Sequence, residues 1–313
     1  MASGRLMVRS YGDSYIGRRQ NNEDALGKRE PNDPVLRTER GCLYVVSDGM
    51  GGHAAGEIAS KMAVQTVLSG YYADGRAPEE SLVDVIREAS RRIYVAAGDA
   101  IETEGMGCTI VACAVSTNRA TIAHVGDSRA YRLRGGELSL LTEDHRRNPD
   151  NSHMLSRAVG VRPDVEVSTL QCACEPGDRF LLCTDGLSNS VPEAEISKSM
   201  KEPTPRAATS ALLRLAAEHE ADDNSSAIVI DVLAAQSEPL SAETDHIECP
   251  PPVADSPQEA RELSGGSATE VETVSEPGWA PSLFEPAAPV DAKTSRAYCL
   301  GSWKRFFGVK GRT

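Results

Sequence analysis

The order in which strand-like and helix-like segments follow one another most limits the folds that this chain can adopt. Short apolar runs rich in β-branched residues predict strands, and apolar residues three or four apart predict helices. Strands are expected at residues 6–10, 42–46, 108–116, 120–125, 130–134, 138–141, 165–174, 179–184 and 227–233. Helices are expected from residue 58 to about 71 and at 78–100, 193–200 and 205–218.

These segments do not alternate strand with helix, as a doubly wound parallel sheet would require. Two helices come together, a group of strands follows, and two more helices precede the last strand. The order therefore predicts an α+β fold in which antiparallel sheets carry helices on their outer faces.

Charge and cysteine usage narrow the classes of partner and the compartment. The net charge of −13 argues against a nucleic-acid partner, because phosphate backbones require a basic surface. Six of the eight cysteines lie in apolar strand-like runs and none has CxxC spacing, which predicts buried thiols in a reducing compartment. Because no stretch resembles a signal peptide or is long and apolar enough to span a membrane, the expected location is the cytoplasm.

The composition changes after residue 234, which divides the chain into three expected parts. Residues 1–234 hold all the predicted strands and helices. Residues 235–292 hold nine of the 18 prolines and twelve acidic residues against the single base Arg261, which predicts a disordered acidic linker. Residues 293–313 carry six basic residues and no acidic one.

The basic tail also holds aromatic residues, namely Trp303, Phe306 and Phe307. One interpretation is a docking segment that rests on an anionic membrane surface, on a partner or on the acidic linker. The tail would then associate the protein with a membrane although it is too short to span one. The other interpretation is a disordered end without function.

Acidic residues recur beside glycine or asparagine at the predicted strand ends. They are Asp48, Asp127, Asp185, Asp223 and the pair Glu23-Asp24. Taken singly, each could be a solvated turn, but in one fold they can converge on the same rim. Carboxylates brought together repel unless cations lie between them, and oxygen-only ligands favour Mg²⁺ or Mn²⁺. Such a pair of ions can activate water to attack a phosphoryl group.

Seven short motifs, five of which contain these acids, follow one another in the order seen in metal-dependent protein phosphatases. They are Gly17-Arg18-Arg19 with Asn22-Glu23-Asp24, Ser47-Asp48-Gly49-Met50-Gly51-Gly52-His53, Gly105-Met106-Gly107-Cys108-Thr109, Gly126-Asp127-Ser128-Arg129, Leu141-Thr142-Glu143-Asp144-His145, Thr184-Asp185-Gly186-Leu187 and Asp223-Asn224. Over roughly residues 5–234 the chain resembles the bacterial branch of the protein phosphatase 2C-like family. The resemblance implies a four-layer α-β-β-α fold, an antiparallel β-sandwich flanked by helices, that hydrolyses phosphoserine and phosphothreonine in proteins.

The resemblance also implies a role for each acidic residue. Asp48 would bridge two Mg²⁺ or Mn²⁺ ions, and the Gly49 carbonyl would bind the first of them. Asp185 and Asp223 would hold the second ion. Asp127 would belong to a third, weaker metal site.

Further residues have implied roles around the two ions. Glu23 and Asp24 would order water on the metals. Arg19 would clamp the substrate phosphate, because a planar guanidinium can hold two phosphate oxygens. His53 is expected either to act in the site or to cap the following helix.

The sequence departs from the family in two places. Asn189 stands where an aspartate is common, which predicts a weakened third metal. The stretch between Asp144-His145 and Leu155 is short, so substrate selection by a flap is in doubt.

Two other functions are compatible with parts of the pattern. One is a catalytically weak phosphatase-like scaffold that binds phosphoproteins, although Asp48, Asp185 and Asp223 are all retained. The other is a small-molecule phosphoesterase, although the GxxxxGK[ST] phosphate-binding loop is absent. By analogy with the family, the expected partners are phosphoprotein substrates and a serine/threonine kinase in the same pathway.

Overall fold

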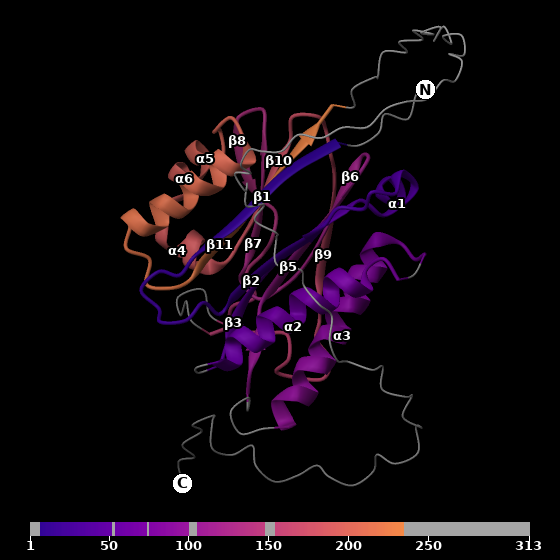
Figure 1. The fold of residues 1–313 in the computed structure, drawn as a ribbon, viewed down its shortest axis with the longest axis vertical. Coiled ribbons are helices and arrows are strands. Elements are labelled where there is room, and N and C mark those ends of the chain that lie inside the picture. The colour runs from indigo at the N-terminus through magenta and orange to yellow at the C-terminus, as the bar shows by residue number, and fades with distance from the viewer. Residues whose placement is uncertain (1–6, 52–53, 74, 100–104, 148–153, 235–313) are drawn as a thin grey trace, which may run out of the picture. The chain divides into compact units, whose positions relative to one another are not determined.

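Two antiparallel sheets face each other in the structure, a computed structural model that describes residues 7–51, 54–73, 75–99, 105–147 and 154–234 (Figure 1). The first sheet has the order β1 (Met7–Tyr15), β11 (Ser225–Leu233), β10 (Arg179–Cys183), β7 (Arg129–Arg134) and β8 (Glu137–Leu140). The second has the order β2 (Asp24–Arg29), β3 (Cys42–Met50), β5 (Ile110–Ser116), β6 (Arg119–Val125) and β9 (Ser168–Ala173), with the short β4 (Gly107–Cys108) paired to β3.

Helices cover the outer face of each sheet. The second sheet packs against α2 (Ala54–Gly70) and α3 (Pro78–Asp99), and the first against α4 (Asp185–Ser190), α5 (Glu193–Ser199) and α6 (Pro205–Glu218). A third apolar cluster fills the space between the sheets. The predicted α+β sandwich with helices on both outer sides is therefore confirmed.

Strand β3 shows why the central strands are apolar at almost every position. Leu43 and Val45 face α2 and α3, whereas Tyr44 and Val46 face the other sheet. Because successive side chains of a strand point to opposite faces and both faces are covered, the run has no polar alternation.

Three elements were not expected from the sequence, and two strands are longer than expected, namely β1, which runs to Tyr15, and β3, which runs to Met50. β2 and the short α1 (Pro34–Arg40) lie where a loop and a connection were expected, and α4 was not predicted. β2 was missed because it is a partly exposed strand at the edge of its sheet with polar residues along it. α1 begins after Asp33, whose carboxylate accepts hydrogen bonds from the Val35 and Leu36 amides as an N-cap.

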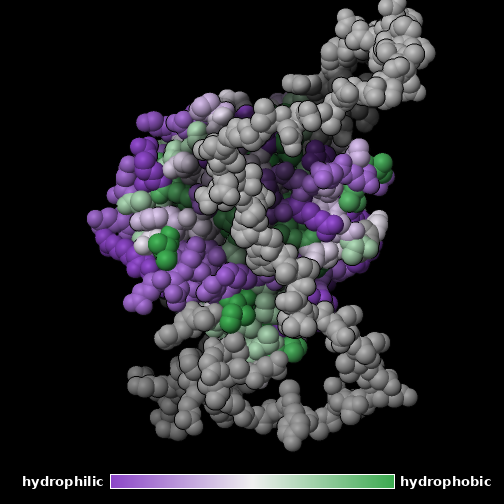
Figure 2. All heavy atoms as spheres, in the orientation of Figure 1, coloured by the Kyte–Doolittle hydropathy of each residue, from purple (hydrophilic) through white to green (hydrophobic). Residues whose placement is uncertain are grey.

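The coloured part of the face seen in Figure 2 is largely hydrophilic, with smaller apolar areas. Of the helices in the described part of the chain, none has the length and apolar character needed to cross a membrane. The six cysteines in that part are free thiols, and five of them are buried. The linker and tail, residues 235–313, lie outside the described residues, so the boundary near residue 234 stays a prediction.

Candidate metal centre

Asp24 and Asp48 lie side by side on neighbouring strands. They are directly opposed in the antiparallel pairing of β2 with β3, which places their side chains on the same face of the sheet. The Gly49 amide donates to the Glu23 carbonyl at 3.1 Å and fixes this register. Asp48 was expected just after the strand, but it lies inside β3, which continues to Met50.

Asp185 and Asp223 come from the other sheet. Asp185 is the first residue of α4 and is separated from β10 by Thr184, and Asp223 lies two residues before β11. β10 and β11 are antiparallel neighbours with Cys183 opposite Ala227, so the end of one and the start of the other meet at the same edge. We call Asp24, Asp48, Asp185 and Asp223 the carboxylate cluster.

Two hydroxyl groups join the sheets at this cluster. The Thr184 and Ser226 hydroxyls donate to Oδ2 of Asp24 at 2.9 and 2.7 Å. Asp24 is buried, and its other oxygen, Oδ1, has no hydrogen-bond partner among the described residues. Since a buried carboxylate oxygen without a partner is costly, this atom marks a place for a cation.

The pKa values of the carboxylate cluster also indicate a cation site. Burial raises the pKa of Asp24 to about 7, with Asp223 and Asp185 adding to the rise and the two hydroxyls opposing it. Burial and the neighbouring carboxylates also raise the pKa values of Asp48 and Asp185, whose carboxyl groups lie within hydrogen-bonding reach of each other. The arrangement is unfavourable for ionised carboxylates unless positive charge is added.

The donor set fits hard divalent cations. Within the residues that the structure describes, no three acidic, histidine or cysteine side chains enclose one point closely enough to hold an ion unaided. Mg²⁺ in particular keeps several water ligands and is usually held by only one or two carboxylates. An open cluster of oxygen ligands therefore suits Mg²⁺ or Mn²⁺ better than a closed protein cage would.

A second layer of hydroxyl groups positions Asp48. The Asp48 amide donates to Oγ1 of Thr109 at 3.0 Å, and that oxygen lies 2.6 Å from Oγ of Ser128. The Thr109 amide donates to the Asp48 carbonyl at 2.8 Å, and the Ser47 hydroxyl donates to the Thr109 carbonyl at 2.6 Å. No role was assigned to these hydroxyls from the sequence, although Thr109, Ser128 and Thr184 all stand inside the motifs.

Glycine is required at two positions because backbones meet there. A Cβ atom on Gly49 would lie 2.1 Å from the Gly56 carbonyl oxygen, at the start of α2. A Cβ atom on Gly186 would lie 2.0 Å from the Asn224 carbonyl oxygen. Each Asp-Gly pair thus lets a neighbouring segment approach the cluster as closely as backbone atoms allow.

The structure places Arg19 at the cluster. Its guanidinium donates to Oδ2 of Asp223 at 2.7 Å, and both side chains are partly exposed, at 55% and 40%. Gly17 has a φ of +66°, and its Cα packs against the Asp223 backbone. This contact brings the loop that carries Arg19 to the carboxylate cluster. Asn224 holds the same loop, accepting from the Glu23 amide and donating to the Ile16 and Asn21 carbonyls.

Asp127 lies beside the cluster and is paired with arginine. Arg146 Nε donates to its Oδ2 at 3.2 Å and lies 3.4 Å from Oδ2 of Asp144. Arg129 donates to both oxygens of Asp144, at 2.9 and 2.8 Å. Burial and Asp185 raise the pKa of Asp127 to about 6, and Arg146 opposes the rise. We call Asp127, Asp144, Arg129 and Arg146 the arginine-paired group; neither arginine was singled out from the sequence.

Three residues predicted for the site remain, namely Glu23, Gly49 and His53. Glu23 and Gly49 lie at the cluster on the β2 and β3 side, as their neighbours require. His53 lies outside the described residues, so its role stays a prediction.

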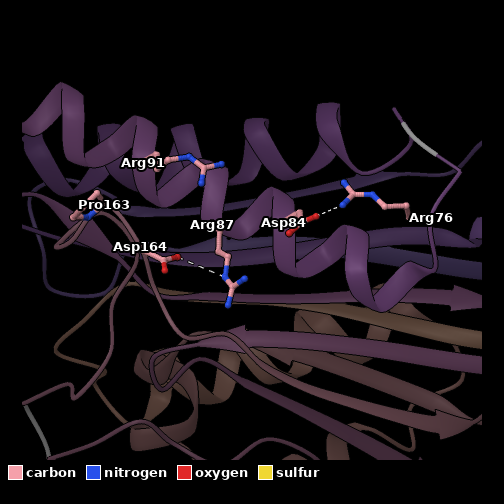
Figure 3. Close-up of a pocket in the computed structure, with 6 residues that line it drawn as sticks. All are labelled: Arg76, Asp84, Arg87, Arg91, Pro163 and Asp164. Atoms are coloured by element: carbon pink, nitrogen blue, oxygen red, sulfur yellow. Dashed lines mark hydrogen bonds and ion pairs between the residues drawn. The ribbon is translucent and has the colours of Figure 1, made fainter. Parts of the chain in front are cut away.

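The structure also has a surface hollow of about 650 Å³ whose lining includes none of these site residues. Figure 3 shows its side chains, in which Arg76 pairs with Asp84, and Arg87 lies 3.6 Å from Asp164. Because these arginines already face carboxylates, the hollow has little excess charge with which to select an anionic ligand.

Known proteins of one family are similar to this chain. The family model described as protein phosphatase 2C matches residues 11–221. The serine/threonine phosphatase stp of Listeria innocua is 36% identical over 205 residues, covering 58% of this chain and 79% of that protein.

Two solved structures are similar over most of their own length. PppA, described as a key regulatory component of T6SS in Pseudomonas aeruginosa, is 33% identical with a TM-score of 0.62, covering 72% of this chain and 98% of that one. The catalytic domain of the serine/threonine protein phosphatase PstP, in complex with two manganese ions, is 31% identical with a TM-score of 0.64, covering 73% and 99%.

Proposed function

This chain belongs to the protein phosphatase 2C family, and from that premise we propose that its carboxylate cluster is the two-ion centre of a serine/threonine protein phosphatase. The reaction is the hydrolysis of phosphoserine and phosphothreonine in proteins, and it depends on Mg²⁺ or Mn²⁺. The observation that carries the assignment is the buried Oδ1 of Asp24, which lacks a partner among the described residues and lies among carboxylates with raised pKa values.

Asp48 is proposed to bridge the two ions, since it faces Asp24 on one side and Asp185 on the other. Asp185 and Asp223 are proposed to hold the second ion and the Gly49 carbonyl to bind the first, with Glu23 and Asp24 ordering water on the metals. Bound divalent cations would offset the charge of the phosphoryl group and lower the pKa of the attacking water. Thr109, Ser128, Thr184 and Ser226 hold the carboxylates in place.

Arg19 is proposed to bind the substrate phosphate. Its side chain is more than half exposed and points to the cluster through Asp223, so it can exchange that carboxylate for a phosphate at little cost. A guanidinium offers two parallel N–H groups to two phosphate oxygens, whereas a lysine offers only a point charge.

The test combines metal removal with variants of Arg19. Chelation by EDTA should abolish hydrolysis of a phosphothreonine peptide, and added Mn²⁺ should restore it. Arg19→Ala should raise KM about tenfold and lower kcat less, and Arg19→Lys should recover little of the loss. Full activity in EDTA contradicts the two-ion centre, and an unchanged KM in both variants makes Arg19 structural.

The proposed partners follow from the reaction. Phosphoserine and phosphothreonine in proteins are the products of serine/threonine kinases, so we propose that such a kinase acts on the same substrates. The free thiols of the described cysteines support the proposal of a cytoplasmic location.

The basic aromatic tail is proposed to bind an anionic membrane surface or a partner, with the acidic linker as a tether. A chain ending at residue 234 should keep peptide hydrolysis and lose binding to vesicles that contain phosphatidylserine. High salt should mimic that loss in the full chain, because salt screens the attraction. Equal vesicle binding by the full and shortened chains would refute the membrane role.

A further inference from the structure

The arginine-paired group is the second place where acidic side chains gather near the site. Its side chains are largely buried: Asp127 is 6% exposed, Arg146 14%, Asp144 16% and Arg129 21%. Two carboxylates face two guanidinium groups, so within this group the charges balance. A buried, balanced group attracts a divalent cation much less than a cluster of carboxylates alone does.

The group is joined to the carboxylate cluster through Asn189. Nδ2 of Asn189 donates to Oδ2 of Asp185 at 3.0 Å, and its Oδ1 accepts from Nη2 of Arg146 at 3.4 Å. An aspartate at this position could accept from Arg146 but could not donate to Asp185. The amide is therefore the group that matches an arginine on one side and a metal-binding carboxylate on the other.

The backbone fixes where the Arg146 side chain begins. Arg146 forms a β-bridge with Leu155, the Arg147 amide donates to the Met154 carbonyl at 2.9 Å, and the Ser156 amide donates to the His145 carbonyl at 2.8 Å. These bonds tie together the two segments on either side of residues 148–153. Arg146 is thus anchored at a stem rather than on a free loop.

We propose that the Arg146 guanidinium takes the place of a third cation beside the two-ion centre. The chain then binds two divalent ions and not three, and Asp127 serves as the counter-ion of Arg146 instead of as a metal ligand. Asn189 is the positioning residue that connects this built-in cation to Asp185. The inference rests on the proposed two-ion centre but concerns a different set of side chains.

The experiment counts Mn²⁺ ions bound to the full chain by equilibrium dialysis with metal analysis and by calorimetric titration. The wild-type chain should bind two ions. Arg146→Ala should bind a third, weaker ion that is lost again in Arg146→Ala/Asp127→Asn. Adding Asn189→Asp to Arg146→Ala should lower the Kd of the third ion about tenfold, because the new carboxylate supplies a charged oxygen ligand.

Two further variants of the chain serve as a control and as a second test. Arg162→Ala removes an exposed arginine whose carbonyl is held by Ser90 on α3, and it should still bind two ions. Asn189→Asp alone should also bind two, because Arg146 pairs with the new carboxylate, and this variant serves if Arg146→Ala does not fold.

Three outcomes overturn the proposal. They are a third ion in the wild-type chain that Asp127→Asn removes, a third ion in Asn189→Asp alone, and a folded Arg146→Ala chain that still binds only two. Binding of fewer than two ions by the wild-type chain, or a count that Asp48→Asn leaves unchanged, contradicts the two-ion centre instead. The two proposals therefore fail in distinguishable ways.

Discussion

The carboxylate cluster and the arginine-paired group are joined through Asn189, but they differ in where their positive charge comes from. In the arginine-paired group, Arg129 and Arg146 supply it from within the chain. In the carboxylate cluster, the one arginine in contact is Arg19, which touches only the partly exposed Asp223 among the described contacts. Burial and the neighbouring carboxylates raise the pKa values of Asp24, Asp48 and Asp185, and burial also raises the pKa of Asp127 to about 6, although Arg146 opposes that rise.

A fold can leave part of an acidic site without enough positive charge of its own. A fully paired group gains structural stability and gives up the ability to bind ions. An unpaired group costs stability in the metal-free state and recovers it when metal binds the folded form. Ion-pairing within the chain therefore separates structural acids from acids available for chemistry.

The largest expected effect comes from removing one charge at the centre of the carboxylate cluster. Asp48→Asn should lower kcat/KM for a phosphothreonine peptide by about 10³, since metal ions supply several kcal/mol of transition-state stabilisation. The metal-free variant should nevertheless melt at a higher temperature than the metal-free wild-type chain, because like charges no longer repel. A lower melting temperature without metal would contradict the account of the cluster.

The stability of the metal-free chain should depend on pH, because the carboxylate cluster holds protons in the folded state. The folded metal-free chain holds protons on Asp24 up to about pH 7, whereas the unfolded chain loses them near pH 4. Since the folded state then binds more protons across that window, the free energy of unfolding should fall as pH rises, by on the order of a few kcal/mol.

Urea unfolding in EDTA between about pH 4.5 and 7.5 measures this slope. Saturating Mn²⁺ should remove the decline, because the ions stabilise the ionised carboxylates. Asp24→Asn should reduce it, leaving the part due to Asp48 and Asp185, whose pKa values are also raised, and to Asp127, whose pKa is raised to about 6. Stability that rises with pH in EDTA would contradict the sign of these pKa shifts.

Removing a charge from the arginine-paired group should lower the stability of the metal-free chain, whereas Asp48→Asn should raise it. Asp144→Asn leaves Arg129 and Arg146 partly unpaired, so it should destabilise the metal-free chain by about 2 kcal/mol. The matched control is Asp164→Asn, whose exposed carboxylate lies 3.6 Å from Arg87 and should change stability by less than about 0.5 kcal/mol. Denaturant midpoints for both variants check the difference, and equal midpoints would remove the contrast between buried and exposed pairs.

The smallest effect is expected for the hydroxyl layer behind Asp48. Thr109→Val keeps the shape of the side chain but removes the acceptor of the Asp48 amide, which should cost about 1 kcal/mol of stability. Activity should fall less than tenfold, with a shift to higher Mn²⁺ concentration for half-maximal rate. Thr121→Val, at a buried position on β6, is the control and should leave the Mn²⁺ requirement unchanged.

Sequence reasoning identified the parts of the site that stand next to glycine or asparagine and missed those that act across the fold. Asp48, Asp185 and Asp223 have local signals, and the structure brings them together. The Arg146 pairing could not be foreseen, because it depends on how residues 127, 144 and 189 meet in space. The β2 strand was also missed, since its place at the sheet edge leaves it without an apolar run.

Of the fold, the sequence predicted the layers and most strands because their burial on both faces produces apolar runs. The end of β3 was placed too early for a related reason. Ser47 and Asp48 look like the end of an apolar strand, yet Thr109 and Glu23 supply backbone and hydroxyl partners that continue the pairing. Tertiary hydrogen bonds of this kind leave no local pattern.

The position of Asp48 inside β3 sets how the site exchanges amide hydrogens with solvent. β3 lies between β2 and β5, and the Asp48 and Gly49 amides are bonded to Thr109 and Glu23. Their exchange should follow the global opening of the sheet, whereas the partly exposed loop around Arg19 should exchange through small local fluctuations. The strand side of the site should therefore open only when the whole domain opens, whereas the loop that carries Arg19, the residue proposed to bind the substrate phosphate, can adjust locally.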